Sequence, residues 1–292
     1  MVGGPRHRLL LLLLGPALFV LAMVTVGPFV YLVVTSVTPL ELTRPDSFRF
    51  VGLANYRSLL ADERFWNSVR VQFWLSAATV LAQLGLGLAL AVLLNQPLPL
   101  REALRTAFIL PMVLPPIVVA IIWKILFTPL LTPFNLLTTP LGLSQPAWLT
   151  APALALWTIV IADVWEWTPF TMLLILAALQ MLPQDPLDAA QVDGASTWQR
   201  FRWITLPLLR PALVVAGLFR LIDSFKAFPL IFVMTGGGPG IATEPTNYYA
   251  YTQAFNHTDI GYSSAMIVIM LLVTMALSVA ALRLPGLRPD VE

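Results

Sequence analysis

Six long apolar stretches constrain the fold of this chain more than any other feature of its sequence. A bilayer core about 30 Å thick is crossed by a helix of about 20 apolar residues. Such stretches occur at about residues 9–37, 71–94, 107–127, 151–182, 213–234 and 263–284. We therefore predict an all-α, multi-pass integral membrane protein: six transmembrane helices in a bundle, embedded in the lipid bilayer, forming a single transmembrane domain over residues 1–292.

Composition points to the same class of protein. The chain is 58% hydrophobic and 11% charged, whereas soluble domains contain about 25% charged residues. Basic residues are spread along the chain, which argues against a nucleic-acid site. The sequence has no cysteine and only two histidines, His7 and His257, so we expect neither thiolate chemistry, nor a metal site, nor a histidine-based catalytic triad.

The first apolar stretch follows Arg6, His7 and Arg8, a basic start that also opens secretory signal peptides. The apolar region of a signal peptide is about 7–15 residues long and precedes a small-residue cleavage site. This stretch is much longer and no clear cleavage site follows it, so we predict a retained transmembrane helix.

Arginines next to the apolar stretches indicate the orientation, because cytoplasmic loops carry more positive charge. With the N-terminus inside, the cytoplasmic side carries Arg6, Arg8, Arg101, Arg105, Arg200, Arg202, Arg210, Arg283 and Arg288. The outer side then carries fewer, namely Arg44, Arg49, Arg57, Arg64 and Arg70. We predict that both termini and the polar segment 183–212 lie in the cytoplasm.

Two of the stretches have features of packed helices. The second carries small residues one turn apart, at Ala78, Ala82, Gly85 and Ala89. Small residues let helix backbones approach closely. The third contains Pro111, Pro115 and Pro116, and we expect it to be kinked or broken because proline removes a helix hydrogen bond. Lys124, near its outer end, is expected to extend its ammonium group toward the interface.

The segment 183–212 has the pattern of a helix–turn–helix outside the bilayer. Asp185, Pro186 and Asp188 suit the N-cap, first and third positions of a short helix. Gly194 then provides a turn.

Ser196 and Gln199 form a capping-box pattern that begins a second helix. Its apolar face carries Phe201, Ile204 and Leu208. This pattern alone fits both an element that docks on a partner and an amphipathic helix that rests on lipid headgroups.

The spacing of this segment resembles the EAA loop of ATP-binding-cassette (ABC) importer permeases. The family pattern is EAA, three residues, Gly, nine residues, Ile-x-Leu-Pro. Here three residues separate Asp188-Ala189-Ala190 from Gly194, and nine residues separate Gly194 from Ile204-Thr205-Leu206-Pro207. The one departure is Asp188, where the family usually has Glu.

The resemblance implies that this loop is a coupling helix, which inserts into a groove on a separate cytoplasmic ATPase dimer. ATP-driven closure of that dimer would turn the pathway from inward- to outward-facing. The coupling residues implied are Asp188, Ala189, Ala190, Asp193, Gly194, Ile204, Leu206 and Pro207. The chain itself would be no enzyme and bind no cofactor, since the partner uses ATP-Mg. A second homologous permease and an external solute-binding protein would complete the importer in the bacterial cytoplasmic membrane.

Other segments resemble the carbohydrate permeases related to the maltose and glycerol-phosphate systems. These are Phe50–Tyr56, Phe219–Phe228, Thr235–Gly240, and Gly261-Tyr262 with Ala265. The resemblance implies that the cargo is a carbohydrate or polyol. Glycerol phosphate, a polyamine or another solute stays open as cargo. A secondary transporter driven by an ion gradient is a further alternative, but it offers no role for the loop.

The glycine-rich run Gly236–Gly240 is a candidate phosphate-binding loop by composition. Such a loop needs a Lys-Ser/Thr pair after the glycines and a strand before them. The sequence offers neither, so we predict an outer turn that a docking protein can approach closely.

Charged residues inside the apolar stretches are the last informative feature, because ionisable groups in a membrane are costly and mark functional sites. In one interpretation, the acids of the fourth stretch pair with the bases of the fifth and hold the bundle together. In the other, some of these side chains, with nearby aromatic rings, line a wet pathway and contact substrate hydroxyls. The predicted pathway residues are Asp163, Trp165, Glu166, Trp167, Arg220, Asp223, Lys226 and Phe228. Glycosidase chemistry also uses paired carboxylates, but two acids on one buried helix turn leave no open cleft for it.

Overall fold

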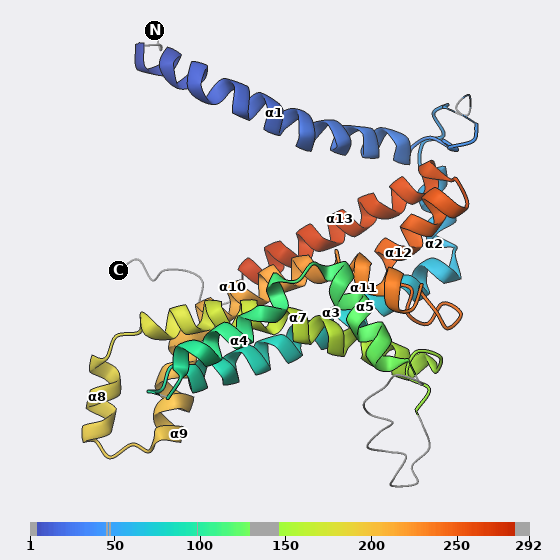
Figure 1. The fold of residues 1–292 in the computed structure, drawn as a ribbon. Helices are drawn as coiled ribbons and strands as arrows, with labels where there is room; N and C mark the ends of the chain where they lie inside the picture. The colour runs from blue at the N-terminus through green and yellow to red at the C-terminus, as the bar shows by residue number, and fades with distance from the viewer. Residues whose placement is uncertain (1–4, 45, 47, 98, 129–145, 284–292) are drawn as a thin grey trace. The chain divides into compact units, whose positions relative to one another are not determined.

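The computed structural model describes residues 5–44, 46, 48–97, 99–128 and 146–283 (Figure 1). The helices are α1 (Pro5–Ser36), α2 (Ala54–Leu60), α3 (Glu63–Leu94), α4 (Arg101–Val113), α5 (Pro116–Phe127), α7 (Pro152–Gln180), α8 (Asp185–Val192), α9 (Thr197–Arg200), α10 (Leu206–Ser224), α11 (Phe228–Met234), α12 (Thr246–Tyr251) and α13 (Ile260–Leu282). In the described chain, π-helical turns follow α9 at η3 (Phe201–Thr205) and α12 at η4 (Thr252–Asn256). Within the described ranges, extended pairing is limited to isolated bridges of Glu41 with Arg44 and Asp259. The predicted all-α class is confirmed.

Within the described residues, five helical segments are long and apolar enough to cross a membrane. They are Leu12–Ser36, Glu63–Leu94, Pro152–Gln180, Thr197–Ser224 and Ile260–Leu282. The pair α4 and α5, bent by 96° at its break, is a sixth candidate in the described chain when the two helices are taken as one span. The break lies where it was predicted: Leu114 and Pro115 are extended, and Pro116 starts α5. A residue that precedes proline is pushed out of the helical region, which ends α4.

The fifth apolar stretch departs from the prediction of one helix over 213–234. The helix starts earlier, at Leu206, and ends at Ser224. A second short helix, α11, then starts at Phe228 and carries Pro229 in its first turn. In a continuous helix Pro229 would donate no hydrogen bond and its ring would clash with the Phe225 carbonyl, which favours the break between α10 and α11.

Contacts divide the chain into two compact units, residues 1–65 with 249–272, and residues 66–248 with 273–292. In the first unit, the Phe50–Tyr56 motif holds the end of α1. The Asn55 side-chain amide donates to the carbonyls of Ser36 (2.9 Å) and Thr38 (2.8 Å), and the Tyr56 hydroxyl donates to Ser36 Oγ (2.8 Å). Gly261 lies against the Thr38 carbonyl, where a Cβ atom has no room.

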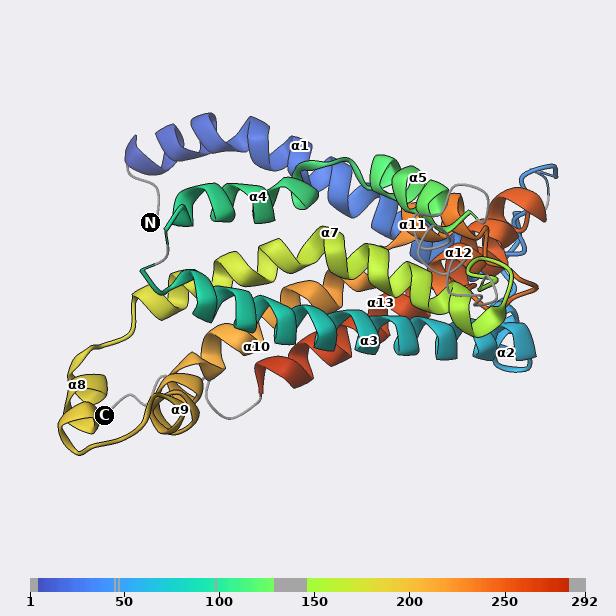
Figure 2. The ribbon, with the colours of Figure 1, turned by 60° about the horizontal axis from the view of Figure 1, so that its bottom comes forward.

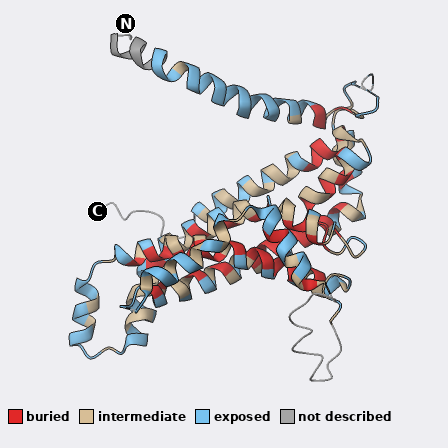
Figure 3. Cartoon of the chain, in the orientation of Figure 1, coloured by how far each residue is buried: buried red, intermediate tan, exposed pale blue. Residues whose placement is uncertain are grey.

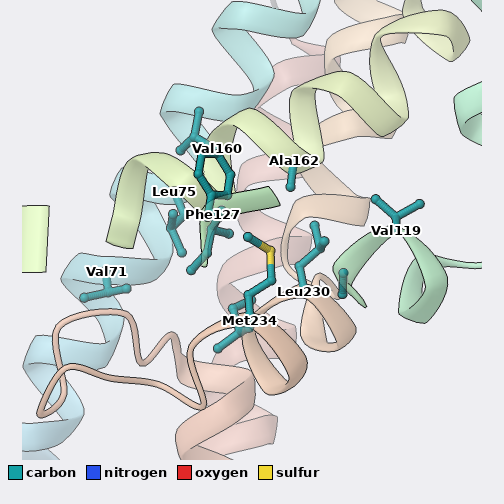
Figure 4. Close-up of a cluster of buried hydrophobic side chains, with 11 residues drawn as sticks. Val71, Leu75, Val119, Phe127, Val160, Ala162, Leu230 and Met234 are labelled. Carbon is teal, nitrogen blue, oxygen red and sulfur yellow. The ribbon is translucent and has the colours of Figure 1, made fainter. Parts of the chain in front are cut away.

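The second unit is built around α7, which packs against α4, α5 and α10 (Figures 1 and 2). In the most apolar part of α7, 61% of the residues are buried, compared with none in the most apolar part of α1 (Figure 3). One apolar cluster joins α3, α5, α7 and α11 (Figure 4); it contains Val71, Leu75, Val119, Ala120, Phe127, Ile159, Val160, Ala162, Leu230, Ile231 and Met234. A second cluster joins α3, α7 and α10; it contains Ala91, Leu94, Met172, Ile175, Leu176, Leu179 and Leu209. These clusters hold together α3, α7 and α10, the helices that carry the buried polar residues Gln83, Asp163 and Arg220.

The small residues of α3 pack differently from the prediction. A Cβ atom on Gly85 would meet nothing within 4 Å, whereas one on Gly87 would lie 2.8 Å from the Thr171 side chain. Gly85 and Ala89 are exposed, and Gly87 is buried against α7. The close approach of α3 and α7 therefore occurs at Gly87, two residues from the predicted stripe.

Candidate functional site

The segment between α7 and α10 folds as the predicted helix–turn–helix. Helices α8 and α9 stand beyond the ends of α7 and α10 in Figure 1. Gly194 has φ +80°, a left-handed conformation that suits glycine. The capping box is confirmed: Ser196 Oγ accepts a hydrogen bond from the Gln199 backbone N–H (3.3 Å), and Gln199 Oε1 accepts one from the Ser196 N–H (2.7 Å).

The predicted N-cap of α8 is wrong by one residue. Gln184 occupies the cap position without a side-chain capping bond, and Asp185 is the first helical residue. Asp185 and Asp188 both lie in the first turn, where their charges still favour the positive end of the helix. The reason for the shift is that Gln184 already has helical dihedral angles, φ −80° and ψ −31°.

The proposed coupling residues occupy one loop but differ in exposure. Four of them are exposed: Asp188, Ala189, Asp193 and Gly194. The other four are half-buried: Ala190, Ile204, Leu206 and Pro207. Arg200 Nη1 donates to Gln191 Oε1 (2.7 Å), which ties α9 to α8. The loop is therefore a preformed element with one exposed helical face.

Sequence reasoning missed two exposed tryptophans in this loop. Trp198 is 69% exposed and Trp203 is 72% exposed. Trp198 packs on Phe201 with ring centroids 5.7 Å apart, and Phe201 begins the π-helical turn η3 that joins α9 to α10. Two tryptophans in a polar segment were the available signal, because large exposed aromatics are typical of partner surfaces.

The buried charges of α7 and α10 meet through a third helix. Arg220 Nη2 lies 3.4 Å from Asp163 Oδ2. Gln83 of α3 bridges the two: its Nε2 donates to Asp163 Oδ2 (2.8 Å), and its Oε1 accepts from Arg220 Nε (2.8 Å). All three side chains are buried. The predicted pairing of acids with bases is confirmed for Asp163 and Arg220, while Gln83, a polar residue in an apolar stretch, was missed.

The remaining charges extend this network toward the surface. Arg220 Nη1 lies 3.5 Å from Asp223 Oδ2, and Lys226 Nζ lies 3.8 Å from Asp223 Oδ1. The Arg220 guanidinium also lies 4.8 Å from the ring centroid of Trp167. A buried guanidinium needs such partners, because the desolvation of an isolated charge costs several kcal/mol, of order 5.

Glu166 is different from the other charged residues. Its side chain is buried, with 1% of the residue exposed. Neither carboxyl oxygen has a hydrogen-bond partner among the described residues. The interpretation that the acids of α7 pair with bases is therefore wrong for Glu166.

A cavity of about 150 Å³ lies beside these residues. Its walls are Pro116, Asp163, Glu166, Trp167, Arg220, Asp223, Lys226, Ala227, Pro229 and Leu230. Six of the predicted pathway residues thus meet at one cavity. Two others pack elsewhere: Trp165 lies edge-on to Trp123 (5.7 Å), and Phe228 stacks on Phe232 (5.4 Å). Charged and aromatic groups around a small cavity suit a polar, hydrogen-bonding ligand.

A second polar cluster, in the first unit, was not predicted. Asp62 Oδ2 accepts hydrogen bonds from the hydroxyls of Tyr249 and Tyr262, both at 2.6 Å, and Arg64 lies over the Tyr249 ring (4.9 Å). Burial raises the pKa of Asp62, but these hydrogen bonds outweigh it and hold the pKa below its ordinary value. Burial and the nearby carboxylate raise the pKa of Tyr249 to about 12. The cluster joins the start of α3 to α12 and α13.

Two smaller predictions are also tested by the structure. The run Gly236–Gly240 forms a turn, as predicted, in which Gly236, Gly237 and Gly240 have positive φ. It follows helix α11, whereas a phosphate loop follows a strand. Lys124 Nζ donates to the Val233 carbonyl (2.7 Å), so it caps a neighbouring helix rather than only reaching the interface.

Fold and site together define a helical membrane protein with a broken helix pair, a preformed loop between two long apolar helices, and a cavity whose wall includes five charged side chains. The family described as the binding-protein-dependent transport system inner membrane component matches residues 83–285. The chain belongs to this family of ABC transport permeases.

Curated relatives agree with this assignment. The trehalose/maltose transport system permease protein MalF of Thermococcus litoralis is 39% identical over 241 residues, covering 82% of this chain and 81% of that protein. The sulfoquinovosyl glycerol transport system permease protein SmoG of Agrobacterium fabrum is 35% identical over 276 residues, covering 94% and 90%. The trehalose transport system permease protein SugA of Mycobacterium tuberculosis is 35% identical over 266 residues, covering 91% and 84%.

A solved structure shares the fold. A chain of the bacterial alginate ABC transporter, crystallised with an alginate pentasaccharide-bound periplasmic protein, superposes with a TM-score of 0.82 at 21% identity. The match covers 94% of this chain and 93% of that chain. The relatives above are permease components of transport systems, and this chain is a membrane protein of the same kind.

Proposed function

We propose that this chain is the permease subunit of an ATP-driven importer that carries a carbohydrate or polyol delivered by a solute-binding protein. The observation that carries the proposal is the loop of α8 and α9. It is exposed, preformed by a capping box and a left-handed glycine, and it has the EAA spacing. The alternative of a secondary transporter driven by an ion gradient offers no role for a loop with this spacing.

In this proposal the exposed face of α8 enters a groove on a cytoplasmic ATPase dimer. Ala189 and Gly194 allow close approach of the partner surface, since both are small and exposed. Asp188 and Asp193 are exposed acids that can form ion pairs or hydrogen bonds with the ATPase. Ile204, Leu206 and Pro207 attach the loop to α10 through the continuous helix 197–224. Movement of the loop is then transmitted directly to the helix that carries Arg220.

The cavity beside Arg220 is the proposed part of the cargo pathway. Trp167 offers an aromatic face for the C–H surface of a sugar ring, and carboxyl groups accept hydrogen bonds from hydroxyls. Asp163 and Arg220 are buried and paired, so we assign them first to holding the wall of the cavity. The sugar cargo of the relatives MalF, SmoG and SugA supports the choice of a carbohydrate.

The importer so proposed contains a second homologous permease and an external binding protein. ATP-Mg is bound and hydrolysed by the ATPase and not by this chain. Both termini and the α8–α9 loop lie in the cytoplasm of a bacterial cell. Glycerol phosphate, a polyamine or another solute is the alternative cargo.

The experiment reconstitutes the complex in proteoliposomes and measures ATP hydrolysis and uptake with the binding protein and a panel of sugars. Gly194→Glu should abolish ATP-driven uptake, because it fills the close-contact position and strains a left-handed residue. Gln184→Glu is the matched control, since it adds the same charge at an exposed position of the same loop. Uptake that persists without any ATPase subunit would instead establish a secondary transporter.

A further inference from the structure

The cavity beside Arg220 has an unequal number of acids and bases in its wall. Its acidic members are Asp163, Glu166 and Asp223, and its basic members are Arg220 and Lys226. With every group ionised, the wall carries one negative charge more than it carries positive charges. This inventory covers each charged residue that lines the cavity in the described part of the chain.

Both bases are already engaged by protein groups. Arg220 directs Nη2 to Asp163 (3.4 Å), Nη1 to Asp223 (3.5 Å) and Nε to Gln83 (2.8 Å), and its face covers Trp167. Lys226 lies 3.8 Å from the second oxygen of Asp223. A ligand that enters the cavity therefore meets no cation without an acidic partner among the lining residues.

Glu166 is the acid that this pairing leaves over. It is nine-tenths or more buried, it lines the cavity, and both of its oxygens lack a partner in the described residues. Buried carboxyl oxygens without donors are costly. Hydroxyl groups of a bound ligand would supply the missing donors, whereas an anionic group would bring a second negative charge next to an unpaired carboxylate.

We propose that Glu166 makes this cavity select uncharged polyhydroxyl cargo and reject acidic sugars. The inference rests on the proposed function, because it assumes that cargo passes through this cavity. It goes further in naming the charge class of the cargo and the residue that decides it.

The test compares two probes that differ only at one carbon, methyl α-glucoside and methyl α-glucuronide. Equilibrium binding of each radiolabelled probe is measured on the complete complex in lipid nanodiscs, without the binding protein. The wild-type complex should bind the glucoside at least about tenfold more tightly, since a like-charge contact costs more than one factor of ten. Glu166→Gln keeps the shape and removes the charge, and it should bring the two affinities within about twofold.

Two further variants make the test specific. Glu102→Gln is the control, because Glu102 is an exposed residue in the first turn of α4, away from the cavity wall; it should keep the wild-type ratio. Asp223→Asn should also lower the ratio, because it releases Arg220 and Lys226 from an acid. The Asp223→Asn variant therefore tests the charge selectivity of the cavity even if Glu166→Gln fails to assemble. A purely structural role of Glu166 would change both affinities equally and leave the ratio intact.

Equal binding of both probes by the wild-type complex, or a ratio unchanged in Glu166→Gln, overturns the inference. A wild-type complex that binds neither probe also overturns the inference. ATP-driven uptake by the same wild-type preparation, measured with its binding protein, separates the two hypotheses. Uptake with an unselective cavity contradicts only the role of Glu166, while absence of ATP-driven uptake with every sugar contradicts the proposed function.

Discussion

Removal of the Arg220 side chain is the strongest test of the buried network. In Arg220→Met, the Asp163 carboxylate loses its ion pair at 3.4 Å and Gln83 Oε1 loses a donor at 2.8 Å. Asp163 stays buried, with its side chain 5% exposed, and retains only the Gln83 amide as a donor. Breaking a buried ion pair by removing one partner costs about 3–5 kcal/mol, because the other charge is left without compensation.

The assay is thermal unfolding of the purified protein in detergent. One kcal/mol shifts the Tm of a large domain by about 2–4 °C, so Arg220→Met should lower the Tm by about 10 °C. Arg210→Met is the control, because Arg210 is an exposed arginine on the same helix. The double variant Asp163→Asn with Arg220→Met should recover much of the loss, since both charges are then removed together.

Two results would refute this reasoning. One is an Arg220→Met variant whose Tm stays within about 2 °C of the wild type, a shift of less than 1 kcal/mol. The other is a double variant that is less stable than either single variant, because additive losses mean that Asp163 and Arg220 do not depend on each other.

Three further predictions follow from local geometry. Gly87→Ala should destabilise the protein by about 1–3 kcal/mol, because its Cβ would lie 2.8 Å from the Thr171 side chain. Gly85→Ala is the control and should leave the Tm unchanged or raised. Equal Tm shifts of the two variants in a thermal unfolding assay would contradict the packing of α3 on α7. Ser196→Ala should destabilise the helix that begins the second half of the α8–α9 loop by about 1 kcal/mol. The loss should appear as faster hydrogen exchange of the Gln199 backbone amide. Unchanged exchange at Gln199 would argue against the capping box. The carboxylate of Asp62 stabilises the folded state above its unfolded pKa, about 3.9, because its folded pKa is lower, and this contribution is lost as the pH falls through the folded pKa. The Tm should therefore fall in acid less steeply in Asp62→Asn than in the wild type. Parallel curves of Tm against pH for the two proteins would contradict this prediction.

Local sequence patterns predicted the parts of this protein that depend on near neighbours along the chain. The apolar stretches matched the spans, and the prolines at 115 and 116 broke the third where expected. Ser196 and Gln199 formed the predicted capping box, since a cap involves only residues three apart. The helix at 213–234 was the exception, because Pro229 was not recognised as a break.

Contacts between distant helices were predicted only in part. Charge complementarity was enough to anticipate the pair of Asp163 and Arg220. It did not show that Gln83 bridges them or that Glu166 stays without a partner. Likewise the stripe around Gly85 was visible in the sequence, but the close approach occurs at Gly87. Which side of a helix meets a neighbour depends on rotation about its axis, and hydropathy does not specify that rotation when all sides are apolar.

By itself, the sequence determined the membrane class, the spans, the exposed helix–turn–helix and the family resemblance carried by the spacing from Asp188 to Pro207. Only the tertiary structure decided which side chains share the cavity: Trp165 and Phe228 lie outside its wall, and Glu166 lies in the wall with neither carboxyl oxygen hydrogen-bonded to a described residue. The physical reason is the range of the interactions. Helix formation and capping act over a few residues, whereas the cavity is made by α5, α7, α10 and α11, which come together through packing across more than a hundred residues of chain, from Pro116 to Leu230.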